Sequence, residues 1–163
     1  MHLRPLTRAD EPLLWEMLVH ALHVPPGTDP FPPEMVRQPK LARYVTGWMT
    51  RPGDLGVAVE LAGEAVGATW VRLWRADEPG FGFVNEVTPE LSMAVHPGYR
   101  GRGLGTALLH RMLEDARDHF EAMSLSVSAT NPAQHLYQRL GFTVITSSRD
   151  GSLTMGKPLT DVA

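Results

Sequence analysis

No cysteine occurs among the 163 residues of the chain, which excludes disulfides, thiolate metal ligands and a cysteine nucleophile. No apolar run is long enough to cross a bilayer, and no charged start precedes an apolar segment. The net charge of −3 lacks the basic excess that is typical of nucleic-acid binding. We therefore expect a cytoplasmic protein that has neither a membrane nor a nucleic acid as its partner.

Several signatures of catalytic and metal sites are also missing. The P-loop triplet Gly-Lys-Ser/Thr does not occur, and a dinucleotide fingerprint begun by Gly101 and Gly103 would need a glycine where the chain has Thr106. There is no G-x-S-x-G nucleophile elbow. The seven histidines show no H-E-x-x-H spacing, and no carboxylate is placed in the sequence to complete such a site. We therefore predict no metal ligands.

The spacing of apolar residues predicts a mixed α/β fold with a largely antiparallel sheet. A length of 163 residues suits one core, so we expect a single domain over residues 1–163. Alternating or β-rich segments predict the strands, at residues 2–6, 55–61, 65–74, 90–95, 123–129, 142–147 and 152–157. Helical spacing predicts helices near residues 10–22, 34–49 and 103–120 and after Asn131.

Turn signals separate these elements. Gly63-Glu64 is typical of a tight hairpin turn, and Arg149-Asp150-Gly151 indicates a second hairpin. Five prolines and a glycine make residues 24–33 a loop. Gly141 follows the last helix as a stop signal.

The most informative stretch runs from Glu90 to Leu113. A strand ends there, a loop with glycines at positions 98, 101, 103 and 105 follows, and a helix begins. Glycines let backbone N–H groups approach a ligand closely, and a helix N-terminus adds unpaired N–H groups and a positive dipole end. Arg100 and Arg102 add positive charge. The stretch therefore predicts a site for a phosphate or pyrophosphate.

Two spaced motifs in this half of the chain resemble one family. Arg100-x-x-Gly103-x-Gly105 is similar to the coenzyme A signature of the Gcn5-related N-acetyltransferases (GNAT), Gln/Arg-x-x-Gly-x-Gly/Ala. Asn131 and Tyr137, with the "GF" that ends at Phe142, resemble the second signature of the family, N-x-A-x-x-x-Y-x-x-x-GF. The resemblance covers about a third of the chain, and the first half agrees only in the order of its elements.

The resemblance implies a central mixed, mostly antiparallel sheet with helices on both faces, the acyl-CoA N-acyltransferase fold. It also implies acetyl-CoA as co-substrate. The pantetheine arm would bind backbone groups of Met93, Ala94 and Val95, and Asn131 and Ala133 would contact the cofactor. The residues implied for the pyrophosphate are Arg100, Gly101, Arg102, Gly103, Leu104, Gly105 and Thr106.

The implied reaction is attack of a neutral amine on a thioester, which needs a base for the amine and a donor for the leaving thiolate. By resemblance the donor is Tyr137, although an aromatic packing residue would fit the same position. By resemblance the candidate base is Glu90, which lies on the strand where some members of the family carry a catalytic glutamate. Alternation places Glu90 on one face with Ser92 and Ala94. A solvated charge at a strand end is the alternative role of Glu90. Glu86 and a water chain are the other candidate bases.

The acceptor is not identified by the sequence. A small-molecule amine and a peptide, acetylated at its N-terminus or at a lysine, are both consistent with the resemblance. A non-catalytic acyl-CoA-binding module is the alternative of another class, and acylation of a hydroxyl would need a stronger base. Candidate walls for the acceptor are the loop at residues 24–33 and the aromatic residues Trp70, Trp74, Phe81 and Phe83. Homodimers are common in the family, but no residue here indicates an interface.

Overall fold

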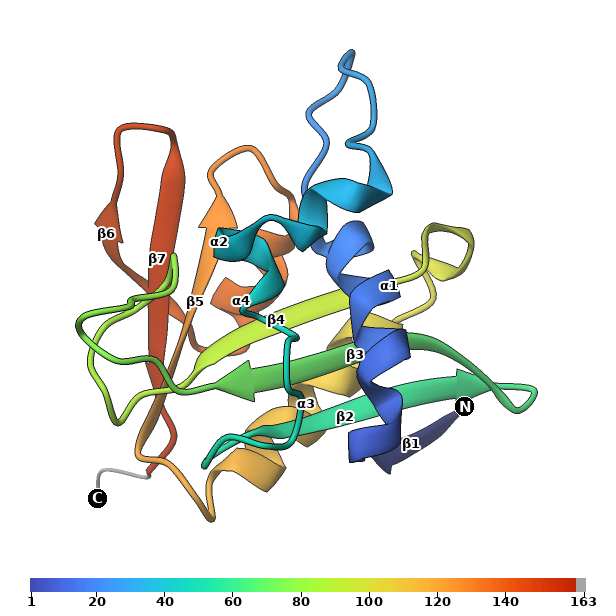
Figure 1. Cartoon of the computed structure of the whole chain (residues 1–163), viewed down its shortest axis with the longest axis horizontal. Coiled ribbons are helices and arrows are strands. Elements are labelled where there is room, and N and C mark those ends of the chain that lie inside the picture. The colour runs from blue at the N-terminus through green and yellow to red at the C-terminus, as the bar shows by residue number, and fades with distance from the viewer. Residues whose placement is uncertain (161–163) are drawn as a thin grey trace.

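The computed structural model describes residues 1–160, and the last three residues of the predicted domain lie outside the described part. The described strands form one sheet in the order β1-β2-β3-β4-β5-β7-β6 (Figure 1). Their bounds are β1 His2–Pro5, β2 Leu55–Leu61, β3 Glu64–Arg72, β4 Glu90–Val95, β5 Ala122–Ser128, β6 Thr143–Ser147 and β7 Ser152–Pro158. Neighbouring strands are antiparallel except β4 and β5, which are parallel.

Helices cover both faces of the sheet, and each face has its own apolar core. In Figure 1, α1 and α2 lie in front of the sheet and α3 behind it. One core packs beneath α1, and the other beneath α3 and α4. The predicted fold class is therefore confirmed. The helix bounds are α1 Glu11–Ala21, α2 Pro39–Ala42, α3 Leu104–Ala116 and α4 Ala133–Arg139, with 3₁₀ turns η1 Arg8–Asp10, η2 Pro33–Arg37 and η3 Pro97–Tyr99.

The parallel pair β4–β5 is short. Only Glu90 with Ser124 and Leu91 with Leu125 are in register, whereas β4 continues to Val95 and β5 to Ser128. Beyond Leu91 the two strands separate, so the backbone of β4 lacks a strand partner on that side within the described residues. A sheet split in this way offers free N–H and C=O groups to a ligand.

The helix expected at residues 34–49 is wrong. The structure has the 3₁₀ turn η2, then the single turn of α2, then irregular turns up to Met49. Pro39 removes a backbone donor and holds Gln38 at φ −64° and ψ 143°, outside the helical region. Gly47 and Met49 both have φ +66°, which no helix allows. The apolar spacing came from a segment that packs on α1 without being a helix.

Smaller differences concern turns. The first hairpin turns at Ala62 and Gly63, with φ of +52° and +81°, so the turn lies one residue before the predicted Gly63-Glu64. Positive φ at both central residues is typical of the two-residue turns that β-hairpins prefer. The second hairpin closes where Ser148 N–H donates to Ser152 O at 2.9 Å, as predicted. Gly141, at φ +100°, ends α4.

A buried ion pair organises the irregular segment. The guanidinium of Arg72 donates all five of its N–H groups, two to the carboxylate of Asp54 and three to backbone carbonyls. These carbonyls belong to Arg43, Thr46 and Gly47, at 2.7–2.9 Å. Both charged side chains are 1% exposed. The pair therefore ties residues 43–54 to β3.

Replacing Asp54 by alanine is expected to lower the free energy of unfolding by about 3–5 kcal/mol, because the charge of Arg72 would stay buried without its partner. Urea unfolding of the purified protein measures this loss. The matched control is Asp77→Ala, which breaks the exposed ion pair with Arg75. The side chains of Arg75 and Asp77 are 78% and 65% exposed. That control should cost about 0–1 kcal/mol, and equal losses in the two variants would contradict the structural role of the buried pair.

Candidate active site

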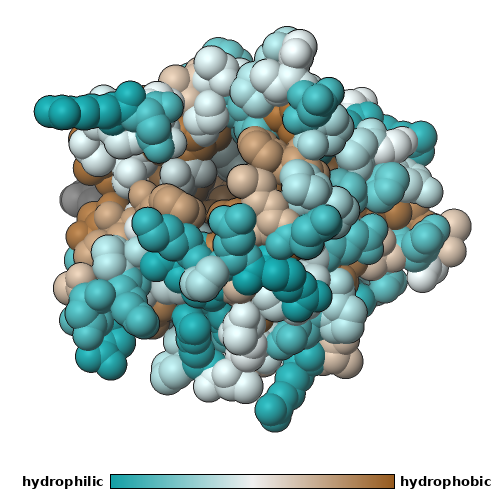
Figure 2. Space-filling view, turned by 45° about the horizontal axis from the view of Figure 1, so that its top comes forward, coloured by the Kyte–Doolittle hydropathy of each residue, from teal (hydrophilic) through white to brown (hydrophobic). Residues whose placement is uncertain are grey.

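A cleft of about 970 Å³ opens where β4 separates from β5. Its walls come from α1, the loop after α1, β4, the turn before α3, β5 and α4. Apolar residues such as Leu18, Leu22, Leu41 and Phe31 line the cleft, and so does the glycine loop. Figure 2 shows apolar side chains bordering a hollow on this face of the molecule, with hydrophilic side chains around them.

Backbone groups of β4 face the cleft at alternate residues. His96 N–H donates to Val66 O at 2.8 Å, and the register pairs Ala94 with Ala68. In an antiparallel ladder these residues turn their N–H and C=O toward β3, and the residues between them turn theirs away. Met93 and Val95 therefore present backbone groups to the cleft. Ala94 lines the cleft, but its backbone N–H and C=O are turned toward β3, so a cofactor contact at Ala94 stays a prediction that this backbone direction does not favour.

The glycine loop leads into α3 in the predicted geometry. Gly101 and Gly103 both have φ +78°, and a Cβ added to either would meet no atom within 4 Å. Gly103 is the N-cap of α3 and has no side chain to cap the helix. The N–H groups of Leu104, Gly105 and Thr106 therefore lie in the first turn, where helices leave donors unpaired. This end of the cleft can bind an anion through the backbone and the helix dipole.

The two arginines of the loop differ. Arg100 lines the cleft, donating from Nε to Val95 O at 3.2 Å and from Nη2 to His20 O at 3.1 Å. It thereby joins the end of β4 to the end of α1. Arg102 is exposed, with its guanidinium carbon 5.1 Å from the centre of the Tyr99 ring, and it is not among the residues lining the cleft.

The second motif also lines the cleft. Asn131 Oδ1 accepts a hydrogen bond from Ala133 N–H at 2.9 Å, which caps the start of α4. Asn131, Ala133 and Tyr137 all line the cleft. The hydroxyl of Tyr137 makes no hydrogen bond with another described residue, and burial raises the pKa of Tyr137 to about 12. The hydroxyl is therefore protonated at neutral pH and able to donate.

Glu90 is buried, which excludes a solvated charge at a strand end. Its side chain lines the cleft and the residue is 4% exposed. Tyr44 OH donates to both carboxylate oxygens, at 3.0 and 2.8 Å, and Trp74 Nε1 donates to Oε1 at 2.9 Å. Burial raises the pKa of Glu90 to about 7, although donors from Tyr44, the Gly82 backbone and Trp74 favour the charged form.

No cationic side chain of residues 1–160 pairs directly with Glu90. Arg72 lies opposite it in the β3–β4 register, on the same face of the sheet, but all five N–H groups of Arg72 are occupied elsewhere. Arg43 lowers the pKa of Glu90 only through its charge, without a hydrogen bond. Neutral donors around a buried carboxylate leave it close to half-protonated at neutral pH, a state suited to accepting a proton.

Glu90 and Tyr137 reach the cleft from opposite faces of the sheet. Tyr44 and Trp74, which hold Glu90, belong to the core beneath α1, whereas Tyr137 belongs to the core beneath α3 and α4. Both side chains line the same cleft. The separation of β4 from β5 therefore makes a passage through the sheet, with a carboxylate on one side and a hydroxyl group on the other.

Comparison with known proteins agrees with this geometry. The family model described as the acetyltransferase (GNAT) family matches residues 15–142. The chain belongs to this family. The family predicted from the sequence is therefore confirmed, and the match includes most of the first half, where the sequence offered only the order of elements.

Individual GNAT relatives differ in their named substrates. The chain is 44% identical over 59 residues to the L-amino acid N-acyltransferase MnaT of Escherichia coli (strain K12), covering 35% of this chain and 34% of the relative. It is 34% identical over 111 residues to a mycothiol acetyltransferase of Arthrobacter sp. (strain FB24), covering 67% and 33%. The matches thus span about a third of these curated relatives.

One solved GNAT structure resembles the whole chain. It is yncA of Salmonella typhimurium, which is described as an acetyltransferase and was solved with its cofactor acetyl-CoA. The identity is 26% and the TM-score 0.71, covering 100% of this chain and 96% of that one. Ribosomal-protein-alanine N-acetyltransferase from Brucella melitensis follows with 25% identity and a TM-score of 0.66, covering 97% and 99%.

The other sequence candidates have mixed outcomes in this GNAT fold. Of the four aromatic residues considered for the acceptor, only Phe81 lines the cleft, while Trp70 and Trp74 are buried in the core. The loop at residues 24–33 contributes Val24, Pro30 and Phe31 to the cleft wall. Glu86 is exposed, accepts a hydrogen bond from Ala76 N–H at 2.8 Å and does not line the cleft.

Sequence reasoning missed the residues that hold Glu90. Tyr44 lay in the wrongly predicted helix, and Trp74 was considered only as a packing or acceptor residue. The signal that could have revealed this site is the pair Gly80 and Gly82 just before β4. A Cβ on Gly80 would collide with the Trp74 indole nitrogen and the Glu90 carboxylate, and one on Gly82 with the backbone of β5.

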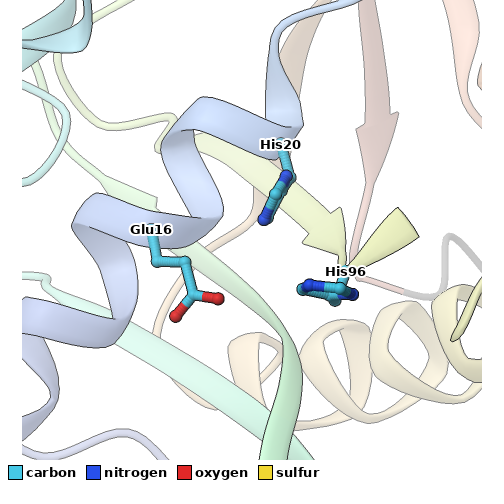
Figure 3. A group of neighbouring side chains, drawn as sticks. All are labelled: Glu16, His20 and His96. Atoms are coloured by element: carbon cyan, nitrogen blue, oxygen red, sulfur yellow. The ribbon is translucent and has the colours of Figure 1, made fainter. Parts of the chain in front are cut away.

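Two histidines and a carboxylate also come together near the end of β4. Figure 3 shows Glu16 and His20, one turn apart on α1, facing His96. A potential ligand atom from each lies within 4.8 Å of the others, so the sequence argument that no carboxylate could join the histidines is wrong. However, His96 Nδ1 accepts a hydrogen bond from Gly98 N–H at 3.1 Å. A neutral ring then carries its proton on Nε2, which leaves no lone pair for a metal, and we retain the prediction of no metal ligands.

Proposed function

We propose that residues 1–163 form one N-acetyltransferase domain that transfers an acetyl group from acetyl-CoA to a primary amine of a small molecule. The amine attacks the thioester directly while both substrates are bound. The observation that carries this proposal is the meeting of Glu90 and Tyr137 in one cleft from opposite faces of the sheet. The base and the donor would then lie on the acceptor side and the cofactor side of the thioester.

The cleft fits acetyl-CoA. The N–H groups of the first turn of α3 and the unobstructed glycines at 101 and 103 suit the pyrophosphate. Backbone groups of Met93 and the N–H of Val95, which are turned away from β3, suit the amides of the pantetheine arm, while Val95 O accepts a hydrogen bond from Arg100. The structural relative yncA, whose cofactor is acetyl-CoA, supports the same choice.

Glu90 would remove the proton of the attacking amine. A lysine-like amine, with a pKa of ~10.4, is neutral in only about one molecule in a few thousand at pH 7. That shortfall is worth roughly 4–5 kcal/mol, and general base catalysis typically recovers about 10²–10⁴-fold in rate. As the amine nitrogen bonds to the acetyl carbon and the carbon–sulfur bond breaks, the amine proton passes to Glu90, directly or through a water.

Tyr137 would stabilise the sulfur as it leaves. A thiol has a pKa of about 8.5, well below the value of about 12 for Tyr137, so full proton transfer from the phenol is uphill. The hydroxyl therefore acts as a hydrogen-bond donor to the developing thiolate, which takes its proton from solvent after release.

The charge of the cleft favours a small acceptor with one amine. Glu90 is the one acidic side chain among the described residues that line the cleft, and the walls near it are apolar. A polyamine or aminoglycoside would leave several cations without partners there. The relative named an L-amino acid N-acyltransferase supports an amino acid as acceptor. We propose L-amino acids with apolar side chains.

Two alternative functions predict different results in an assay of acetyl transfer. Acetylation of a protein N-terminus is supported by the similarity to a ribosomal-protein-alanine N-acetyltransferase. A non-catalytic acyl-CoA-binding module would not need a base and a donor, and the placement of Glu90 and Tyr137 in one cleft argues against it.

The test is a thiol-release assay with acetyl-CoA and a panel of L-amino acids, polyamines, aminoglycosides and peptides, after calorimetry has established cofactor binding. Turnover with L-leucine or L-phenylalanine above that with spermidine supports the proposal. Turnover with peptides alone would favour the protein acetyltransferase. Saturable acetyl-CoA binding without turnover on any amine would identify the binding module.

The variant Tyr137→Phe is expected to lower kcat about 10- to 100-fold at pH 7, because the thiolate loses its donor. Its thermal stability should stay unchanged, since the hydroxyl makes no hydrogen bond with another described residue. Steady-state kinetics with saturating acetyl-CoA measure the effect. Full turnover in this variant would show that Tyr137 only packs against the core.

A further inference from the structure

The carboxylate of Glu90 is held by two side chains from distant parts of the chain. Tyr44 comes from the irregular segment after α2, and Trp74 follows β3. The Tyr44 hydroxyl donates to both oxygens, and the Trp74 indole donates to Oε1 alone. The Tyr44 hydroxyl has one proton, which the two oxygens share, with Oε2 the nearer at 2.8 Å, and the Trp74 proton goes to Oε1.

Tyr44 is itself fixed at several points. Its hydroxyl accepts a hydrogen bond from Phe81 N–H at 2.8 Å, and its backbone carbonyl accepts one from Trp70 Nε1 at 3.0 Å. The preceding carbonyl, of Arg43, accepts one from the buried Arg72 at 2.9 Å. Burial and the charge of Glu90 raise the pKa of Tyr44, so that its hydroxyl stays a donor. These contacts make the position of the hydroxyl independent of any ligand.

We propose that Tyr44 and Trp74 are positioning residues that fix the carboxylate of Glu90 in the cleft, where it receives the proton of the acceptor amine. The inference rests on the proposed role of Glu90 as base. A carboxylate has about four lone-pair sites, and these donors leave at least one of them to accept that proton.

The charged surroundings of Glu90 are limited. From the segment after α2, Arg43 contributes positive charge without a hydrogen bond. From β3, Arg72 is saturated by Asp54 and three carbonyls. From β5, the neighbour is Ser124, whose hydroxyl donates to Gly82 O at 2.7 Å. The neutral donors Tyr44 and Trp74 thus set how readily the carboxylate ionises, and loss of either should favour its protonated form.

The test is a carbon-13 NMR titration of the Glu90 carboxyl carbon, identified by its loss in Glu90→Gln, in wild type and in Tyr44→Phe. This readout needs no acceptor. The wild-type carboxyl should titrate near pH 7, and Tyr44→Phe should move the midpoint upward by about one pH unit, as expected for one lost hydrogen bond to a charge. Trp74→Phe should move it in the same direction.

The matched control is Trp15→Phe. It removes the hydrogen bond of 3.3 Å from the Trp15 indole to the Glu11 carboxylate, and neither of these residues lines the cleft. It should leave the titration of Glu90 unchanged. An unmoved midpoint in both Tyr44→Phe and Trp74→Phe would overturn the inference, even if turnover fell. Retained turnover in Glu90→Gln would instead remove the proposed base, a separate result that calorimetry with acetyl-CoA and the thiol-release assay report.

Discussion

Glu90→Gln should lower kcat/KM by about 10²–10⁴-fold, the range typical of a lost general base. The affinity for acetyl-CoA should change little, because Glu90 lies on the opposite face of the sheet from the glycine loop and Tyr137. The amide keeps the size of the side chain but cannot accept a proton from the amine. Measurement of kcat/KM with the best acceptor of the panel, alongside calorimetry with acetyl-CoA, separates the two effects.

The pH dependence of kcat/KM also tests the role of Glu90, and the raised pKa of Glu90 sets the expected direction. Burial raises the pKa of Glu90 to about 7, and the base must be deprotonated to act. Wild-type kcat/KM should therefore rise with pH through about 7, and Glu90→Gln should lose that acidic limb. Glu86→Gln is the control, since Glu86 is exposed and outside the cleft. An acidic limb that survived in Glu90→Gln and vanished in Glu86→Gln would reverse the assignment.

Gly103→Glu should weaken acetyl-CoA binding by about 100-fold or more, a loss of about 2.7 kcal/mol. The substitution places a carboxylate at the start of α3, where the proposed pyrophosphate would bind, and like charges repel there. It also forces a side chain onto a residue with φ +78°, where glycine is favoured. Isothermal titration calorimetry with acetyl-CoA measures the change.

The control variant Gly151→Glu separates the effect of backbone strain from the effect of a negative charge in the glycine loop. Gly151 has φ +87° and open space around its Cβ position, as Gly103 does, but it lies in the β6–β7 turn outside the cleft. This variant should bear a similar backbone penalty and bind acetyl-CoA as the wild type does. Equal losses of affinity in the two variants would show that the glycine loop does not hold the pyrophosphate.

The end of the cleft proposed for the cofactor could be predicted from the sequence, because the residues that form it are close together in the chain. Backbone N–H groups at a helix N-terminus and glycines at 101 and 103 act through a few consecutive residues, and their spacing in the sequence is their spacing in the fold. Asn131 and Tyr137 belong to one short helix and its cap for the same reason. Similarly, Glu90 could be placed on the correct face of its strand from alternation alone.

The state of Glu90 depended on contacts that no local pattern contains. Its burial, its pKa and its hydrogen bonds come from Tyr44, 46 residues away, and Trp74, 16 residues away. The contact of Tyr44 with Glu90 was missed because the spacing at residues 34–49 suggested a helix. Pro39 and Gly47 prevent that helix. Burial is a property of the assembled layers, and an interrupted helical pattern can pack on a core without hydrogen-bonding as a helix.

The sequence alone was enough for the family, the order of the elements and the geometry of the glycine loop, because these depend on short-range spacing and backbone geometry. Only the tertiary structure could decide that Glu90 is a buried carboxylate without a counter-ion among the described residues, that Arg72 is committed to Asp54, and that β4 and β5 separate after Leu91. These features arise where strands and loops far apart in the chain meet. Desolvation and long-range hydrogen bonds, which act only after that meeting, set the chemistry of the base.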